Sequence, residues 1–471
     1  MMQMAGINAL RCRFSTGARH GMASGIPSAG RYRVTAYFVL TAATVAISIS
    51  TAFAREPDGN FDIPTHLRAA DALRLFREHG LDLILAEAAT ESARGDALLA
   101  SAAPNPSFSG GVGRSFACTS TDTSDCSALA WSVGVSDGSA VFDSVSGKRR
   151  LRMSVANLAL EAAHKGEADA RRTLEGMLRQ SYLQAVAARQ ALATQREAQE
   201  TLARLSELIR ARYQRGSISE VEVLKIETEK LTADQEVERA QRDLDVGKAQ
   251  LAFLLGVRGR IPTFEVDPEL PGYVTPSVLQ GATLESLLDV ARKQRPDLIG
   301  ARIQRDRAEE SVRSSQRLRF PDIELNAGVS GQGTYQSAIN PPTFSFGLTL
   351  TPPIFNRFQG EIVKSRADLA TQKAQVAKAE AQVTNDVQTA FTQFRSARSR
   401  LERAERELLE HAKRTRDLVQ LQYQKGAASL LEYLDAQRIL ISTRLDYESD
   451  LSDYWQAVVL IGQAVGTEIG P

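Results

Sequence analysis

Long stretches of the chain repeat apolar residues with the period of a helix and contain no proline. Proline is absent from residues 107–261 and from residues 354–470, and it is the residue that most strongly interrupts a helix. The two stretches therefore predict very long helices over residues 148–215 and 360–425, each about 100 Å long. The same periodicity predicts shorter helical runs over residues 66–101, 219–255, 283–318 and 429–465.

The second long helix carries an apolar seam whose spacing alternates between four and three residues. The seam consists of Val383, Val387, Ala390, Phe394, Ala397, Leu401, Ala404 and Leu408. A mean spacing of 3.5 residues indicates a left-handed coiled coil, and the alanines in the seam permit close packing of a partner helix. His411 continues the spacing, and we interpret it as a packed residue rather than a metal ligand.

Four short segments between the helices alternate apolar with polar residues, which is typical of strands with one apolar face. They are centred on residues 107–116, 129–136, 323–330 and 344–351. The first is the weakest, with only Phe108 and Val112 on its apolar face. Each segment has about the length of a tilted membrane-spanning strand.

Polar loops at 117–128 and 331–342 separate the members of each pair of segments, so each pair is expected to form a hairpin. We expect Trp131, Phe344 and Phe346 to face lipid. In the alternative arrangement, a sandwich, these side chains would face a protein core instead.

Four strands are too few to close a barrel, and a sheet with open edges is not stable in lipid. The chain must therefore pool its strands with those of other copies. Two copies would give eight strands around a lumen filled by side chains, whereas three would give twelve, which is within the range of outer-membrane barrels. A channel therefore favours the trimer.

One structural unit occurs twice in the chain. The segment 212–219 returns as 422–429, and the same offset relates Gly256 to Gly466. Such a register indicates a duplication. We divide the chain into a first repeat at 55–256, a Pro- and Gly-containing linker at 257–282 and a second repeat at 283–468.

Residues 1–54 are interpreted as a secretory signal peptide. An apolar run at 36–50 follows Arg31 and Arg33, and a small-x-small site ends at Ala54. The alternative is a membrane anchor, but the run is shorter than the ~20 residues that a spanning helix needs. A start at Met22 would give a signal of ordinary proportions.

Cys118 and Cys126 are the only cysteines that follow the signal peptide, and both lie in a loop rich in Ser, Thr and Asp. In an oxidising compartment the favoured interpretation is a local disulfide that braces this loop.

Charge and motifs exclude several functions. The chain has 57 Lys and Arg against 56 Asp and Glu, so no overall field would attract nucleic acid. Gly110-Gly111-Val112-Gly113 lacks a following helix start and fits a strand better than a phosphate loop. No enzyme constellation, cofactor motif or cluster with metal-ligand spacing is recognisable, so we expect no catalytic residues and no metal site.

Helix-capping signals mark the end of each long helix. Gly216 and Gly426 stand where a left-handed residue would end the helix. Two Ser-x-x-Glu capping boxes would then start the return helices. They pair Ser219 with Glu222 and Ser429 with Glu432.

Each repeat is therefore expected to consist of a helix, a β-hairpin, a very long helix, a tight turn and a return helix, in that order. This α+β unit resembles the TolC-type outer-membrane factor family over nearly all of residues 60–468. The residues that carry the resemblance are Tyr213-x-x-Gly216, Tyr423-x-x-Gly426, Arg295-Pro296-Asp297-Leu298 and Pro353-Ile354-Phe355-Asn356.

The resemblance implies a homotrimer in the outer membrane of a Gram-negative bacterium. Its twelve-stranded β-barrel would continue as an α-helical coiled-coil tunnel through the periplasm. The tunnel would dock a periplasmic membrane-fusion adaptor and, through it, an inner-membrane resistance-nodulation-division pump.

The stretch 356–362 is similar to the cobalt-zinc-cadmium efflux branch of the family, although the first copy at 142–147 departs from it. This similarity favours an efflux duct for heavy-metal cations. Two alternatives stay open at this point, namely the outer-membrane channel of a type I protein secretion system and a secreted coiled-coil scaffold without a pore.

The resemblance also implies where a periplasmic gate lies. Leu431-Glu432-Tyr433-Leu434-Asp435 matches the acidic pattern of the family's constriction. In a trimer, Glu432 and Asp435 would place six carboxylates around the axis, which raises carboxylate pKa values and attracts cations. The first copy has Glu222 and Lys225 instead, so only the second repeat would form the ring.

Tyrosines near the two turns are further candidates. Tyr423 and Tyr213 are expected to hydrogen-bond across helices and hold the tip closed, or else to pack near the turns. The family implies adaptor contact at residues Arg212, Tyr213, Gly216, Ser219, Tyr423, Gly426 and Ser429.

Overall fold

The computed structural model describes residues 61–114, 129–333 and 341–469. The signal peptide and both Cys118 and Cys126 lie outside these residues, so the cleavage site and the disulfide stay predictions. The first copy contains α1 (Ala69–His79), α2 (Leu81–Ser101), β1 (Ser107–Arg114), β2 (Leu129–Ser136), α3 (Ala140–Val145), α4 (Lys148–Gln214) and α5 (Glu220–Leu254). The second contains α6 (Leu284–Gln294), α7 (Pro296–Arg317), β3 (Asp322–Gly333), β4 (Thr343–Thr351), α8 (Gln359–Arg403), α9 (Leu409–Gln424) and α10 (Leu430–Val465).

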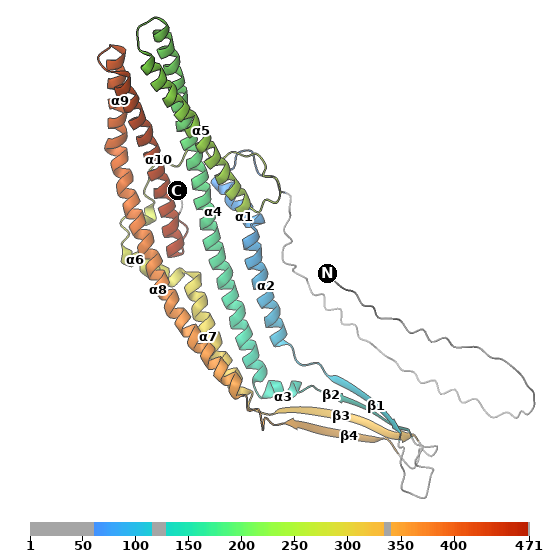
Figure 1. The fold of residues 1–471 in the computed structure, drawn as a ribbon. Coiled ribbons are helices and arrows are strands. Elements are labelled where there is room, and N and C mark those ends of the chain that lie inside the picture. Colours follow the sequence, from blue (N-terminus) through green and yellow to red (C-terminus); the bar gives the residue numbers. More distant parts are fainter. Residues whose placement is uncertain (1–60, 115–128, 334–340, 470–471) are drawn as a thin grey trace, which may run out of the picture. The chain divides into compact units, whose positions relative to one another are not determined.

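The long helices follow the predicted pattern closely. Helix α4 runs for 67 residues without interruption, packs on its return helix α5 and also contacts α2, α7 and α10. In the second copy α8 packs on α7 and α10. The helical hairpins α4–α5 and α9–α10 end in tight turns at the end of the helices away from the strands (Figure 1).

The second long helix departs from the prediction at one place. Residues Ala404–Leu408 form a single π-helical turn, in which the amide of Leu409 donates to the carbonyl of Ala404, five residues back. Val383 to Ala404 are buried as the seam predicted, but Leu408 is 57% exposed and His411 is exposed. The prediction that His411 is packed is therefore wrong, because the π-turn adds one residue and Ala412 takes the buried position.

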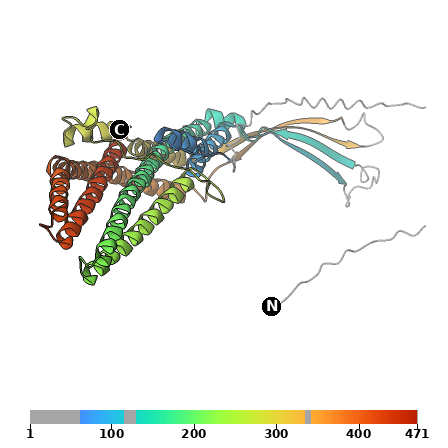
Figure 2. The same cartoon turned by 90° about the horizontal axis from the view of Figure 1, so that it is seen from above.

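The four strands form one antiparallel sheet in the order β1-β2-β3-β4. The two hairpins are joined by pairing of β2 with β3, so the copies share a sheet. Figure 2 shows the strands extending together beyond the helices. Both outer strands keep an open edge within this chain, as expected for a sheet that must find partners.

The register brings the apolar residues of all four strands onto one face. Val133 lies opposite Val329, which lies opposite Phe344, and directly opposed residues share a face. The same face holds Phe108, Val112, Trp131, Val135, Ile323, Leu325, Phe346, Leu348 and Leu350. The other face carries mostly Ser, Thr, Gly and Asn. Among the described residues, no helix is both long and apolar enough to span a bilayer.

The main apolar core lies where the two copies meet. Its largest buried side chains are Trp455 and Tyr454 of α10, which contact each other edge to face. The indole of Trp455 donates to the carbonyl of Pro271, and the hydroxyl of Tyr454 donates to that of Val274. The linker predicted at 257–282 is therefore held against α10.

Arg295 joins three helices of the second copy. It immediately precedes α7 and is only 3% exposed. Its guanidinium donates to Asp297 at 3.0 and 2.7 Å, to Asp386 of α8 at 2.9 Å and to the carbonyl of Ala464 near the end of α10 at 3.2 Å. The buried charge of Arg295 is therefore compensated by acceptors from the start of α7, from α8 and from the end of α10.

Candidate functional site

Both helical hairpins turn with the same backbone geometry. Gly216 and Gly426 have φ of 70° and 76°, in the left-handed region that glycine adopts without strain. In the first turn the amide of Ser217 donates to the carbonyl of Arg212 at 3.0 Å, and in the second Ala427 donates to Gln422 at 2.8 Å. These are Schellman caps, which confirms the predicted helix ends.

The return helices begin differently. Ser429 and Glu432 form the predicted capping box, because the Ser429 hydroxyl accepts from the Glu432 amide and the Glu432 carboxylate accepts from the Ser429 amide at 2.6 Å. These donors lower the pKa of Glu432. Ser219 stands at the corresponding position of α5 but makes no side-chain capping bond. The capping box predicted for Ser219 and Glu222 is therefore wrong.

Tyr423 links the tips of the two copies. Its ring stacks on Tyr433 with centroids 5.6 Å apart and an interplanar angle of 5°. The guanidinium of Arg212, from the first tip, lies over the ring at 5.5 Å from its centroid and donates to the hydroxyl at 3.4 Å. Burial raises the pKa of Tyr423, so the hydroxyl stays neutral at physiological pH.

Tyr213 occupies the equivalent sequence position but not the equivalent environment. It is 44% exposed, whereas Tyr423 is half-buried against the apolar cluster beneath the tips. That cluster joins α4 and α5 to α10. It contains Leu202, Leu205, Ile209, Ile226, Ala233, Leu430, Tyr433 and Leu434. Of the two tyrosines predicted to bond across helices, Tyr423 makes such a bond within this chain, and the bond of Tyr213 stays a prediction.

Asp435 lies one turn beyond Glu432 on α10, so the two carboxylates share a face of the helix. Asp435 accepts a hydrogen bond from Arg438 at 2.6 Å, and both side chains are largely exposed. Within one chain this is a local surface ion pair, which contributes little to stability. The gate role of Asp435 stays a prediction.

The comparisons with known proteins agree with this architecture. A family model described as outer membrane efflux protein matches residues 72–257 and 287–467, one segment in each copy. The chain belongs to the outer membrane efflux protein family. This family is one of transport ducts rather than of enzymes.

Curated members of the family resemble this efflux protein over different shares of its length. The cobalt-zinc-cadmium resistance protein CzcC of Cupriavidus metallidurans is 22% identical over 429 residues, which cover 91% of this chain and 96% of CzcC. The pyoverdine export outer membrane protein OpmQ of Pseudomonas aeruginosa is 26% identical over 60% of this chain and 59% of OpmQ.

Solved structures share the fold. A membrane protein from Pseudomonas aeruginosa superimposes with a TM-score of 0.71 and 20% identity, over 85% of this chain and 90% of that one. The outer membrane protein VceC of Vibrio cholerae gives a TM-score of 0.67 and 18% identity, over 85% and 96%. The chain thus has the fold of the TolC-type outer-membrane factors.

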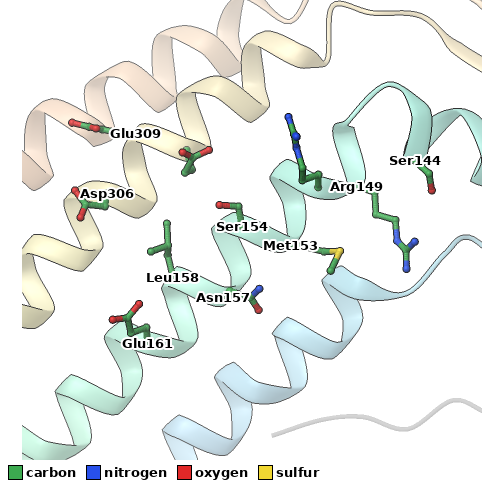
Figure 3. Close-up of a pocket in the computed structure, with 11 residues that line it drawn as sticks. Ser144, Arg149, Met153, Ser154, Asn157, Leu158, Glu161, Asp306 and Glu309 are labelled. Atoms are coloured by element: carbon green, nitrogen blue, oxygen red, sulfur yellow. The ribbon is translucent and has the colours of Figure 1, made fainter.

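A groove of about 790 Å³ lies in this efflux protein between α4 and α7, close to α3 (Figure 3). Asp306 and Glu309 enter it from α7, opposite Leu158 and Glu161 of α4. Asp306 is already paired with Arg305 at 2.6 Å. Across the described ranges, no three His, Cys, Asp or Glu side chains are grouped to hold a metal ion. We therefore assign no ligand site to the groove.

A buried carboxyl group was not anticipated from the sequence. Glu448 of α10 is 6% exposed and accepts a hydrogen bond from Thr194 of α4 at 2.7 Å. Burial raises its pKa, an effect that the hydrogen bond from Thr194 and the charge of Arg444 partly oppose. The sequence around Glu448 is rich in charged residues, so nothing distinguished it from its exposed neighbours.

We expect Glu448→Gln to increase the stability of the efflux protein at neutral pH. An unfolded Glu loses its proton near pH 4.5, whereas folded Glu448 retains it to higher pH. Stability from this group is therefore full below about pH 4.5 and falls as the pH rises through the folded pKa. Thermal unfolding followed by circular dichroism from pH 5 to 8 should show a smaller decline for the variant. Glu410→Gln, at an exposed position of α9, serves as the control, and an equal decline in all three proteins would contradict the assignment.

Proposed function

We propose that this protein is the outer-membrane exit duct of a tripartite efflux system. Three observations support the proposal: the duplicated helix–hairpin–helix unit, the sheet with one apolar face, and membership of the outer membrane efflux protein family. The sheet is the strongest support for an outer-membrane duct. Its apolar face and two open edges suit a closed barrel in lipid, built from the strands of several copies.

Three copies would supply the twelve strands of such a barrel, and their helices would continue it as a tunnel. With the sheet in the outer membrane, the turns at Gly216 and Gly426 would extend into the periplasm. The residues proposed to meet a periplasmic adaptor are Arg212, Tyr213, Gly216, Ser219, Tyr423, Gly426 and Ser429. An inner-membrane resistance-nodulation-division pump would then deliver the cargo.

Heavy-metal cations are the proposed cargo. Full-length similarity to a cobalt-zinc-cadmium resistance protein supports this class, while similarity to a pyoverdine exporter shows that related ducts serve other cargo. In a passive duct the pump selects, and the duct needs no ligand cage. Deleting the gene should sensitise the bacterium to cobalt, zinc or cadmium. Unchanged metal tolerance with impaired export of a polypeptide would favour a type I secretion channel instead.

The proposed gate consists of Asp435, Glu432 and Tyr423. In a trimer, Asp435 and Glu432 would form a ring of carboxylates that attracts cations. Crowding would raise their pKa values, against the lowering that the capping box imposes on Glu432. Tyr423, held by Arg212 and Tyr433, would keep the second tip against the first.

Asp435→Asn should reduce the cation selectivity, because it removes three negative charges from the proposed ring. It should also increase the single-channel conductance, because it removes the ion pair with Arg438 from the proposed gate. The measurement is planar-bilayer conductance of the purified, membrane-extracted protein. Asp243→Asn is the matched control, since Asp243 is also an exposed carboxylate beside an arginine, Arg242. Selectivity that is unchanged by Asp435→Asn would refute the acidic ring. If the trimer is stable but carries no current, the gate lies elsewhere in the protein or opens only when the adaptor is bound.

A further inference from the structure

The helix that leads to the second tip carries two alternative apolar stripes, displaced from each other by one residue. After Ala404 the four-three spacing of the seam continues through Leu408, His411, Thr415, Leu418 and Gln422. A second series with the same spacing consists of Leu409, Ala412, Arg416, Val419 and Tyr423. One residue corresponds to about 100° of rotation about a helix, so the two stripes cannot pack against α10 simultaneously.

The π-turn at Ala404–Leu408 determines which stripe packs. It places one additional residue between the seam of α8 and the start of α9. As a result Ala412 is buried, while Val419 and Tyr423 contact the apolar cluster beneath the tips. The first stripe is left outside, with Leu408 57% and Leu418 54% exposed. Helix α4 of the first copy has no such interruption.

The packed stripe is the more apolar of the two, but a charged residue interrupts it. It contains Leu409, Ala412, Val419 and Tyr423 together with Arg416, whereas the exposed stripe contains Leu408 and Leu418. Burial disfavours the charge of Arg416, which narrows the difference in stability between the two seams. A single π-turn inside an α-helix is uncommon and often marks a functional position.

We propose that the π-turn is a register switch for the α9–α10 hairpin. The additional residue can be accommodated at Ala404–Leu408, as observed, or nearer the turn at Gly426, where the chain already leaves the helix. Moving this residue to the turn rotates α9, which lies between the two places, by about 100° about its axis. Leu408, His411 and Leu418 then enter the seam, and Tyr423 leaves its position beside Tyr433 and Arg212.

The consequence for transport rests on the proposed function. Because Tyr423 is the residue of α9 that contacts the first tip through Arg212, the rotated register would release the second hairpin from the first. Opening would then be a change between two packed states of α9 and would not require the hairpin to unfold.

Disulfide crosslinking can report the register independently of transport. In full-length, membrane-extracted protein with Cys12, Cys118 and Cys126 replaced by serine, Tyr423→Cys with Tyr433→Cys reports the observed register. Gln422→Cys with Tyr433→Cys reports the rotated one, in which residue 422 takes the place of 423. Trypsin cleaves after Lys425, so only crosslinked peptides remain joined before reduction.

Substitutions in the exposed stripe and in the packed stripe should change the ratio of the two crosslinks in opposite directions. His411→Leu with Thr415→Leu strengthens the exposed stripe and should increase the ratio of the 422–433 to the 423–433 crosslink about tenfold, which corresponds to ~1.4 kcal/mol. Arg416→Leu strengthens the packed stripe and should lower the ratio. Deletion of Arg406 leaves one unbroken seam through Tyr423 and should abolish the 422–433 crosslink.

A ratio that neither substitution changes, or that both change in the same direction, would overturn the proposal. So would a 422–433 crosslink that persists at the original level after deletion of Arg406. A metal-tolerant deletion strain would refute the proposed cargo while leaving these crosslinks unaffected, so the two proposals can fail separately.

Discussion

Replacing Arg295 by methionine should lower the free energy of unfolding by about 3–5 kcal/mol, because the change leaves two carboxylates without their buried cation. Asp297 and Asp386 both accept hydrogen bonds from Arg295, as does the carbonyl of Ala464. Methionine can fill much of the space, but it can donate to none of these groups. The helices α7, α8 and α10 would lose their common contact.

The effect of Arg295→Met should depend on pH. Despite desolvation, Arg295 lowers the pKa of Asp297, so the pair contributes stability above the ordinary aspartate pKa near 3.8. That contribution is lost as the pH falls through the folded pKa of Asp297. The difference between the two proteins should therefore be largest at neutral pH and should shrink below about pH 4.

Unfolding in guanidinium can be followed by fluorescence, since Trp455 is buried in the core beside this region. Arg302→Met is a matched control, because Arg302 also connects α7 to α8 through Glu380 at 3.0 Å, but both side chains are exposed. The control should cost less than about 1 kcal/mol. Equal losses for the two variants would show that Arg295 contributes no more than a surface pair.

Local periodicity was sufficient to predict most of the fold. The strands and the long helices lie where the apolar spacing indicated, and the seam of α8 is buried from Val383 to Ala404 as expected. The runs predicted at 66–101 and 283–318 are each divided into two helices, which meet at Gly80 and at Arg295. These features depend on residues close together in the sequence. The apolar spacing shows that a buried helix face needs another helix to pack against, even though it does not show which helix that is.

The prediction failed where the period changes phase. Leu408 and His411 were assigned to the seam on the assumption of one unbroken spacing, although Leu409 and Ala412 begin a second run one residue later. The signal was present in the sequence. Choosing between the runs required the packing of Val419 and Tyr423 against the cluster beneath the tips.

Contacts between distant segments could not be predicted. Nothing in the sequence near Arg295 indicates that Asp386 is its partner, and the pairing of β2 with β3 unites strands from different repeats. The candidate gate was located only through the resemblance to a family. Sequence spacing alone also could not distinguish Ser429, which caps its helix, from Ser219, which does not.

Phe346→Arg should largely prevent assembly in the outer membrane, whereas Ser345→Arg should be tolerated. Phe346 is 87% exposed on the apolar face of the sheet, opposite Ala327, while Ser345 points to the other face. In the proposed barrel the first position meets lipid and the second meets the lumen. An arginine facing lipid costs about 2–4 kcal/mol at the bilayer midplane, and a trimer incurs the cost three times.

The two variants place the same charge at adjacent positions of one strand, so any difference in assembly between them reports which face of the sheet meets lipid. Each can be compared with the unmodified protein by the amount of heat-sensitive trimer in outer-membrane fractions. Ser345→Arg should yield normal trimer, and its added charge should reduce the cation selectivity in planar bilayers. Loss of trimer in both variants would indicate that both faces are packed, as in a sandwich. Normal trimer in both would show that neither face lies in lipid, which would support the scaffold without a pore and exclude the barrel.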